Sequence, residues 1–298
     1  MSKTLFCVDG TWYLNRAYSV LMTQKQPPLD MNAAISAMML SMVCKDALAV
    51  RAHYLVCAFD GDQIFRYKIN PDYKRSRKEK HKEQNKKDPN YQGNGSGRAV
   101  YQYMPAVLET LTNAGISCVQ LAKYEADDIC ASAATLGSPD LHVVLGAGDK
   151  DSMQLINKHV RMYASSTKPE PTWVDEQAVF KKFGVRPDQM IMYQTILGDG
   201  GDDVIGLSGY GPKTVQKICA NFATIKEWRL SLPEEKAKLV NTSVERLRMN
   251  RKLVTLVKDA WRPSSLESLK VAKNNQVKNK AFSHYQAWLY PRAKGLFS

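Results

Sequence analysis

The chain has 298 residues, enough for one large domain or two smaller ones, and its 44% apolar and 24% charged residues are typical of a folded globular protein. No stretch approaches the ~18 consecutive apolar residues of a membrane span, and the N-terminus MSKTLFCVDG lacks the apolar core of a secretory signal. The formal net charge of +13 favours a polyanionic partner such as nucleic acid.

Short apolar runs rich in Val, Ile, Leu and Tyr alternate with longer helical stretches in the first half of the chain. The expected strands are residues 5–8, 54–59, 116–121, 142–145 and 160–163, and the expected helices are 31–50, 99–113 and 125–136. This alternation predicts an α/β fold with a doubly wound, mainly parallel sheet over residues 1–170.

Two regions do not follow this alternation of strands and helices. Residues 66–98 are crowded with Lys and Arg and then rich in Asn, Gly and Ser, so we expect an exposed, mobile excursion between two strands, with a functional role rather than that of a linker. Beyond residue 170 the strand signals stop, and stretches such as GPKTVQKICANF and residues 243–258 predict helices. Residues 171–298 are therefore expected to form a helical region that continues the first domain.

Carboxylates follow four of the expected strands. Because the carboxyl ends of parallel strands share one edge of a sheet, these acids should meet there, although Asp is also common in loops and helix caps. Without His or Cys nearby, they suit a hard cation such as Mg²⁺ or Mn²⁺. Seven acids exceed the needs of one ion and predict two, ~4 Å apart, as in in-line phosphoryl transfer. The acids are Asp9, Asp60, Glu125, Asp127, Asp128, Asp149 and Asp151.

The crowding within YEADD raises a further expectation. Three carboxylates within four positions repel one another, and bound metal would offset the repulsion. In the absence of metal, some of these groups should have raised pKa values.

A second signature, GDGGDDVIGLSGYGPKTVQK, lies at residues 198–217. It adds the acids Asp199 and Asp202 and then places three glycines before an amphipathic helix, whose exposed N–H groups would bind a phosphate with Lys213 alongside. This is the pattern of a helix-hairpin-helix, expected at about residues 190–222, which grips a nucleic-acid backbone without reading its sequence.

These motifs together resemble the 5′-nuclease family, which comprises flap endonucleases, phage 5′→3′ exonucleases and the N-terminal nuclease domain of bacterial DNA polymerase I. The resemblance spans roughly residues 4–260, and the motifs come in the order of the family. They are VDGTWYLNRAY, FDG, FRYKINPDYKRSR, YEADD, GDKD and GDGGDDVIGLSGYGPKT.

The resemblance implies a role for each matched residue. Lys74 and Arg77 would contact phosphate at the base of a helical arch, residues 78–98, through which a single-stranded 5′ end passes, and Arg16 would face the cleaved phosphate. A K⁺ ion is implied on the backbone carbonyls of the hairpin. Metal ligands, direct or through water, would be Asp9, Asp60, Glu125, Asp127, Asp128, Asp149, Asp151, Asp199 and Asp202. DNA contacts would be Arg66, Tyr73, Gly206, Gly209, Gly211, Lys213 and Thr214.

The chain departs from the family pattern in two places. Asp203 stands where the family usually has Asn, and it adds negative charge near the second metal. Asn15 stands where many members carry an aromatic that stacks on the terminal base, so that contact is either weaker or made by Trp12 or Tyr13. The chain is also expected to be free-standing, like phage nucleases, because no polymerase domain follows the matched region in this sequence.

The resemblance implies a divalent-metal-dependent phosphodiesterase that acts as a 5′→3′ exonuclease and flap endonuclease. Its substrates would be 5′ flaps, nicks and ends of DNA and RNA–DNA hybrids, in replication, primer removal or recombination. We expect a monomer in a bacterial or phage-infected host cytoplasm, with a replicative polymerase as a candidate partner and no membrane contact.

Three alternatives are weighed against this interpretation. A PIN-type ribonuclease shares the acidic sheet edge but predicts fewer acids and no hairpin. A catalytically silent, structure-specific DNA-binding protein requires a broken metal site, whereas no matched ligand position is lost. A nucleotide-binding protein would need a glycine-rich phosphate loop that the first helix lacks.

Overall fold

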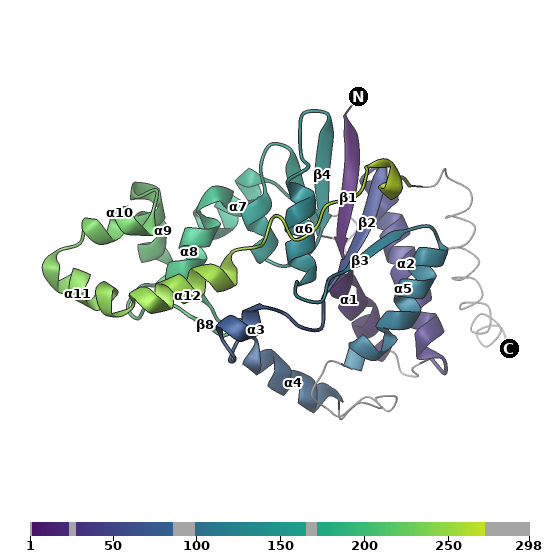
Figure 1. The fold of residues 1–298 in the computed structure, drawn as a ribbon, viewed down its shortest axis with the longest axis horizontal. Coiled ribbons are helices and arrows are strands. Elements are labelled where there is room, and N and C mark those ends of the chain that lie inside the picture. The colour runs from purple at the N-terminus through teal and green to yellow at the C-terminus, as the bar shows by residue number, and fades with distance from the viewer. Residues whose placement is uncertain (1, 24–27, 86–98, 165–171, 272–298) are drawn as a thin grey trace.

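The computed structural model describes all residues except 1, 24–27, 86–98, 165–171 and 272–298. A sheet with helices on both faces makes up one part of the molecule, and helices of the C-terminal half extend away from it (Figure 1). In the part of the chain described, no helix is long and apolar enough to cross a membrane.

The main sheet has six strands in the order β3-β2-β1-β4-β5-β6. The strands β1 to β5 run parallel, and β6 is antiparallel to β5. This confirms the doubly wound, mainly parallel sheet, with the crossover between β1 and β4 where such folds bind ligands. The strands are β1 (Lys3–Asp9), β2 (Tyr54–Phe59), β3 (Ser117–Gln120), β4 (Leu141–Gly146), β5 (Val160–Ala164) and β6 (Thr172–Val174).

Helices cover the sheet in two layers. The helices α1 (Gly10–Met22), α2 (Met31–Ala49) and α5 (Met104–Asn113) pack on one face, and α6 (Ala126–Ala134) packs on the other (Figure 1). Both faces of β1 and β2 are buried, so these strands are almost continuously apolar rather than alternating. The short 3₁₀ segments are η1 (Ala99–Tyr103), η2 (Asp151–Leu155), η3 (Pro187–Gln189) and η4 (Glu267–Leu269).

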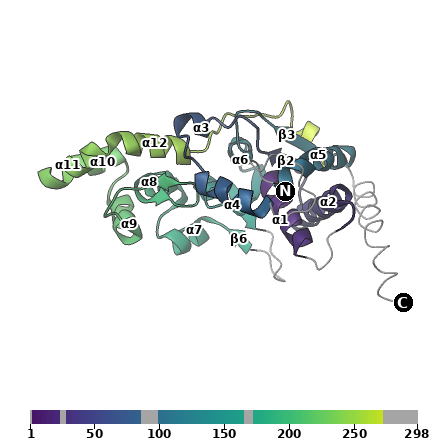
Figure 2. The ribbon, with the colours of Figure 1, turned by 90° about the horizontal axis from the view of Figure 1, so that it is seen from below.

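The C-terminal helices form the second part. Figure 2 shows them at one end of the molecule, with α1, α2 and α5 at the other and α4 between the two. A two-stranded ribbon, β7 (Gly198–Asp199) and β8 (Val204–Ile205), and the glycine loop 206–211 join α8 to α9, where the helix-hairpin-helix is expected. The helices are α7 (Glu176–Phe183), α8 (Met190–Leu197), α9 (Pro212–Asn221), α10 (Ile225–Leu230), α11 (Glu234–Thr242) and α12 (Val244–Val254).

Residues 66–85 correct the expectation of a mobile excursion. They fold into α3 (Arg66–Ile69) and α4 (Arg75–Asn85). Tyr73 between these helices is buried against Val204, Leu253 and Val254, so the segment finds its apolar partners in the C-terminal half. The remainder of the expected arch, residues 86–98, lies outside the described residues.

Candidate metal centre

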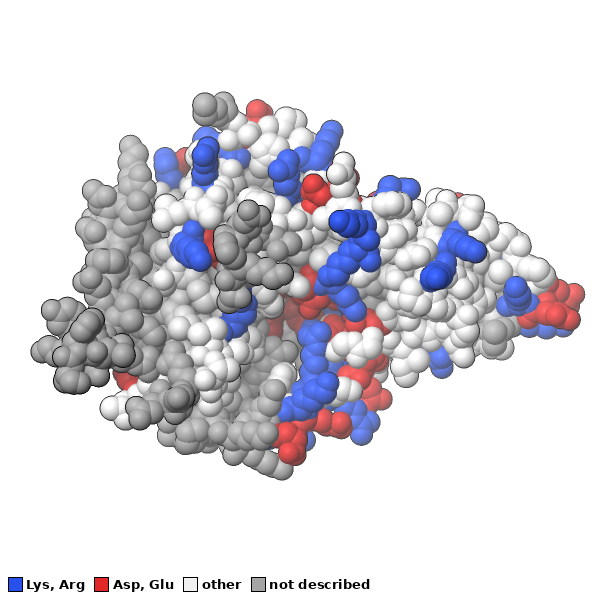
Figure 3. Space-filling view, turned by 180° about the vertical axis from the view of Figure 1, so that it is seen from behind, with Lys and Arg blue, Asp and Glu red and all other residues white. Residues whose placement is uncertain are grey.

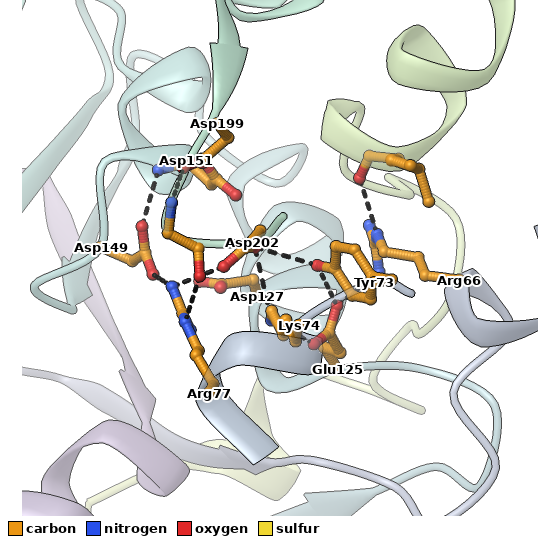
Figure 4. Close-up of polar contacts among 12 residues, drawn as sticks. Arg66, Tyr73, Lys74, Arg77, Glu125, Asp127, Asp149, Asp151, Asp199 and Asp202 are labelled. Atoms are coloured by element: carbon orange, nitrogen blue, oxygen red, sulfur yellow. Dashed lines mark hydrogen bonds and ion pairs between the residues drawn. The ribbon is translucent and has the colours of Figure 1, made fainter. Parts of the chain in front are cut away.

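Acidic side chains from both halves of the chain meet at the carboxyl edge of the sheet (Figure 4). Asp9 ends β1 and its carboxylate accepts a hydrogen bond from the Trp12 amide, which makes it the cap of α1. Asp60 follows β2, and its two oxygens accept from the Ala126 amide and the Tyr101 hydroxyl, each at 2.9 Å. The strand ends therefore place the acids, and the starts of the following helices orient them.

The first group of acids surrounds a small cavity of about 130 Å³. Trp12 and Asn15 of α1 and the cations Lys74 and Arg77 complete its wall. The carboxylates that line this cavity come from the ends of β1 and β2, from the start of α6 after β3, and from the loop after β4. They are Asp9, Asp60, Glu125, Asp127 and Asp149.

The second group joins the sheet to the hairpin of the C-terminal half. Asp151, Asp199 and Asp202 are all buried, and one oxygen from each lies within 4.8 Å of the others. Gln194 of α8 donates a hydrogen bond to Asp151, and the Gly201 amide donates to Asp199 at 2.9 Å. Three carboxylate oxygens this close, with no His or Cys among them, fit a hard divalent cation.

Burial and mutual repulsion raise the pKa values of the central acids. Burial, with the charges of Asp60 and Asp149 nearby, raises the pKa of Asp9 to about 7. Burial, with Asp149 and Asp202 nearby, raises the pKa of Asp151 to about 8. The pKa of Asp127 is raised well above its ordinary value by burial and then by Asp9 and Asp149. This confirms the expectation of raised pKa values.

Lysine 74 sits between the two groups. Its ammonium lies 2.5 Å from a Glu125 oxygen and 3.6 Å from an Asp202 oxygen (Figure 4). Burial alone would raise the pKa of Glu125, but Lys74 and Arg66 outweigh it and the pKa is lowered. In this acid the repulsion expected within YEADD is therefore offset by protein cations.

Two further cations lie against the acids. The Arg77 guanidinium lies 2.5 Å from Asp202 and 4.0 Å from Asp149, and it is one-third exposed. The Lys150 ammonium lies 2.6 Å from Asp199. Acidic and basic side chains consequently adjoin one another in the middle of one face, where the surface is hollowed (Figure 3).

The assignment of Arg66 to DNA and of Asp128 to metal is wrong. The Arg66 side chain is 1% exposed and forms a two-pronged ion pair with Asp128 at 2.6 and 2.7 Å. Its Nε donates to the Leu253 carbonyl, so the guanidinium has no surface to offer a phosphate. The second Asp128 partner is the Val257 amide, at 2.9 Å. These residues tie α3 and α6 to the C-terminal half instead.

Tyr73 is likewise not a surface contact for DNA. It is 3% exposed, and its hydroxyl lies 3.2 Å from Glu125 and 3.1 Å from Asp202. The ring packs edge-on against Tyr67. Tyr73 therefore orients two carboxylates of the centre from within the core.

Arg66→Met is expected to lower the free energy of unfolding by about 3–5 kcal/mol, because it leaves the Asp128 carboxylate buried without its cation. Equilibrium urea unfolding measures the loss. Arg75→Met is the matched control, since Arg75 pairs with Asp72 and Glu79 only at the exposed surface, and it should leave stability unchanged. Equal stability of the two variants would contradict the structural role of Arg66.

Arg16, Trp12 and Asn15 of α1 lie beside the first group of acids. The Arg16 guanidinium stacks over the Trp12 ring at 4.6 Å, and Trp12 lines the small cavity together with Asn15. Tyr13 is fully buried and donates to Asp46, so of the two aromatic replacements considered for a base-stacking residue, only Trp12 reaches the cavity.

The glycine loop 206–211, which precedes α9, has the backbone geometry that its glycines predict. A Cβ at Gly206 would lie 2.0 Å from the Leu197 carbonyl oxygen, and Gly209 has a left-handed φ of +82°. Gly211 is the cap of α9, and Lys213 and Thr214 are exposed in its first turn. The N–H groups of a first helical turn have no acceptor within their own helix, so this exposed turn can bind a phosphate.

Sequence reasoning missed the residues that hold the acids in place. They include Tyr101 on Asp60, Ser152 on Asp127, Gln194 on Asp151 and Lys150 on Asp199. Only Lys150 had a signal, because it stands between two acids in GDKD. Ser152 follows the same motif without being part of it, and Tyr101 and Gln194 lie outside every motif.

The raised pKa values predict how metal and pH act on stability. Asp9 and Asp151 keep protons in the folded state that the unfolded chain, with ordinary values of 3.8, has already lost. In EDTA, the melting temperature should therefore fall as the pH rises from about 5 to 8. Added Mg²⁺ should restore it, with a gain of a few degrees that is largest at high pH, since about 1 kcal/mol corresponds to ~2–4 °C. A pH-independent gain in thermal unfolding scans would contradict the burial of these acids.

Comparisons with known proteins identify the family of the chain. The family model of the 5′-3′ exonuclease N-terminal resolvase-like domain matches residues 4–184, and that of the C-terminal SAM fold matches residues 185–277. A 5′-3′ exonuclease of Aquifex aeolicus is 29% identical over 285 residues, which cover 93% of this chain and 91% of that protein. A flap endonuclease Xni of Pseudoalteromonas translucida is 27% identical, covering 76% and 82%.

Solved structures share the fold. A bacteriophage T5 flap endonuclease, in a pseudo-enzyme-product complex with DNA and metal ions, superposes with a TM-score of 0.67 at 20% identity, covering 95% of this chain and 98% of that one. The catalytic core of Rad2 with a DNA substrate gives 0.57 at 16% identity, covering 97% and 89%. Since the two family models together span nearly the whole chain, this protein belongs to the 5′-3′ exonuclease family, whose members include flap endonucleases.

Proposed function

We propose that this 5′-nuclease uses two Mg²⁺ ions, for which Mn²⁺ can substitute, to hydrolyse phosphodiester bonds near the 5′ ends of DNA. The observation that carries the proposal is the convergence of two acid groups with Lys74 and Arg77 between them. Asp9, Asp60, Glu125, Asp127 and Asp149 would hold one ion, and Asp151, Asp199 and Asp202 the other. Bound divalent ions supply a lowered water pKa and charge neutralisation at phosphate oxygens.

The chain's own residues bind and orient the scissile phosphate. Lys74 is only 14% exposed, so its charge acts on a phosphate in a partly desolvated setting. Arg77 presents several N–H donors from the first turn of α4, in a form suited to phosphate oxygens. Arg16, stacked on Trp12 at the rim of the small cavity, would contact the phosphate on the α1 side.

We further propose that the two parts of the chain divide the work. Residues 1–170 would carry the catalytic core, and residues 171–298 would grip duplex DNA through Gly206, Gly209, Gly211, Lys213 and Thr214. The exposed first turn of α9 supports this grip. A K⁺ ion on the carbonyls of the hairpin would strengthen it.

The cellular setting is also a proposal. The substrates would be 5′ flaps, nicks, ends and RNA–DNA hybrids, handled by a monomer in a bacterial or phage-infected host cytoplasm, with a replicative polymerase as partner. All six cysteines are free thiols, which supports a reducing compartment. Relatives named DNA polymerase I, which this chain matches over about 30% of their length or less, support the link with replication.

The decisive experiment is cleavage of a 5′-end-labelled flap by the full chain. Release of label with Mg²⁺ and none with EDTA is the expected result, and the product length separates single-nucleotide release from flap cutting. Tight, metal-independent binding of the flap without any release would instead identify a silent DNA-binding protein. Cleavage of single-stranded RNA in preference to the flap would favour the PIN-type ribonuclease.

A further inference from the structure

The start of α4 is bonded to the turn that carries two acids of the second group. The Lys74 amide donates to the Asp202 carbonyl at 3.0 Å, and the Arg77 Nε donates to the Gly201 carbonyl at 2.8 Å. The turn therefore holds Lys74, which immediately precedes α4, and Arg77, which lies in the first turn of the helix.

Asp203 adds a cap to this junction. Its Oδ2 accepts from the Ser76 amide at 2.8 Å, and its Oδ1 accepts from the Ser76 hydroxyl at 2.5 Å. Ser76 is the second residue of α4, so its N–H has no acceptor within its own helix. A carboxylate 127 positions away in sequence therefore does the work of a local helix cap.

The reason for this long-range cap lies in Lys74. It occupies the position immediately before α4, where a Ser, Thr, Asp or Asn would ordinarily cap the helix, and an ammonium cannot accept a hydrogen bond. Lys74 and Asp203 also both have left-handed backbones, with φ of 55° and 57°. Such strain in residues other than glycine persists only where the surroundings hold it.

We propose that Asp203 is a positioning residue that supplies the missing cap of α4 and so holds Lys74 and Arg77 in register with the turn carrying Asp199 and Asp202. The catalytic consequence rests on the proposed roles of Lys74 and Arg77. This replaces the expectation that the charge of Asp203 acts on the second metal, since its carboxylate is directed to Ser76.

Three variants of the full chain distinguish the loss of the cap from a change in backbone conformation and from the loss of a charge. Asp203→Gly keeps a residue suited to φ of 57° but removes the cap. Asp203→Asn removes the charge but keeps both bonds, because its amide oxygen can accept from the Ser76 amide and its NH₂ can donate to the Ser76 hydroxyl. Asp175→Gly is the matched control, since Asp175 caps the distant α7.

The first measurement is amide hydrogen exchange across residues 75–85, in which nuclease activity plays no part. Asp203→Gly should speed exchange by at least about fivefold, the effect of losing one helix cap, while Asp203→Asn and Asp175→Gly leave it near wild type. Unchanged exchange in Asp203→Gly, or equal acceleration in Asp203→Asn, would overturn the proposal.

The second measurement separates turnover from binding. Under single-turnover conditions with a Mg²⁺-containing flap assay, Asp203→Gly should cut at least about fivefold more slowly, with DNA affinity within about threefold, and Ser76→Ala should add no further loss in that background. Slow cutting by Asp203→Gly with unchanged amide exchange in α4 would mean that Asp203 acts on the metal centre directly. That result would overturn the capping role. If no variant or wild type cuts DNA, the exchange result still decides whether the cap exists.

Discussion

Asp149→Asn is expected to slow cleavage of a 5′-flap substrate by at least about 1,000-fold while DNA affinity stays within about tenfold. Asp149 lines the cavity of the first acid group, and its charge also raises the pKa of Asp151 in the second. The substitution therefore removes a carboxylate that serves both groups, but no contact of the proposed DNA-binding surface. Single-turnover rates and filter binding measure the two quantities separately.

The matched control is Asp140→Asn, because Asp140 is exposed just before β4, at the opposite edge of the sheet. It should cut at the wild-type rate. Cleavage at the wild-type rate by the Asp149 variant would show that this acid cluster is not the catalytic centre. Asp128→Asn should behave differently from both, with reduced stability, because its carboxylate holds Arg66 rather than facing the cavity.

Lys74→Ala should slow cleavage by about 100- to 1,000-fold, the typical cost of removing one preorganised donor that stabilises developing charge. Its effect on DNA affinity should be much smaller, because a lysine that is 14% exposed reaches a phosphate only inside the centre. A second consequence follows for Glu125, which loses the cation that lowers its pKa. The activity of the variant should therefore fall off at a higher pH than that of the wild type on the acidic side.

The control for charge alone is Lys80→Ala, on the exposed side of the same helix. It should weaken binding and reduce its salt dependence by about one phosphate contact, with an unchanged turnover rate. If Lys74→Ala reproduced that pattern, Lys74 would be a distant phosphate contact rather than part of the centre.

The strands and the acidic edge could be predicted from sequence because both depend on local patterns. The expected run 54–59 coincides with β2, and the other four expected strands agree with the structure to within a residue or two. Parallel strands then bring their following acids to one edge without any knowledge of side-chain contacts. The three-residue β6 was missed because it is too short to show a period.

The direction of each acid could not be predicted. Asp127 and Asp128 are neighbours in one motif, but they lie in the first turn of α6, where successive side chains point about 100° apart. One therefore faces the cavity and the other faces Arg66. The partner of Arg66 is fixed only when the carbonyls of Leu253 and Thr255 come near it, 187 and 189 positions later.

Because of the same long separation, the centre is completed only late in the synthesis of the chain. The N-terminal half emerges from the ribosome first. A chain that has been synthesised as far as β5 already contains all five parallel strands. It still lacks Asp199 and Asp202, the hairpin turn that holds the start of α4, and the C-terminal carbonyls that fix Arg66. We therefore expect a chain that ends before the hairpin to cut no DNA, because it lacks both the second acid group and part of the core that packs against the sheet.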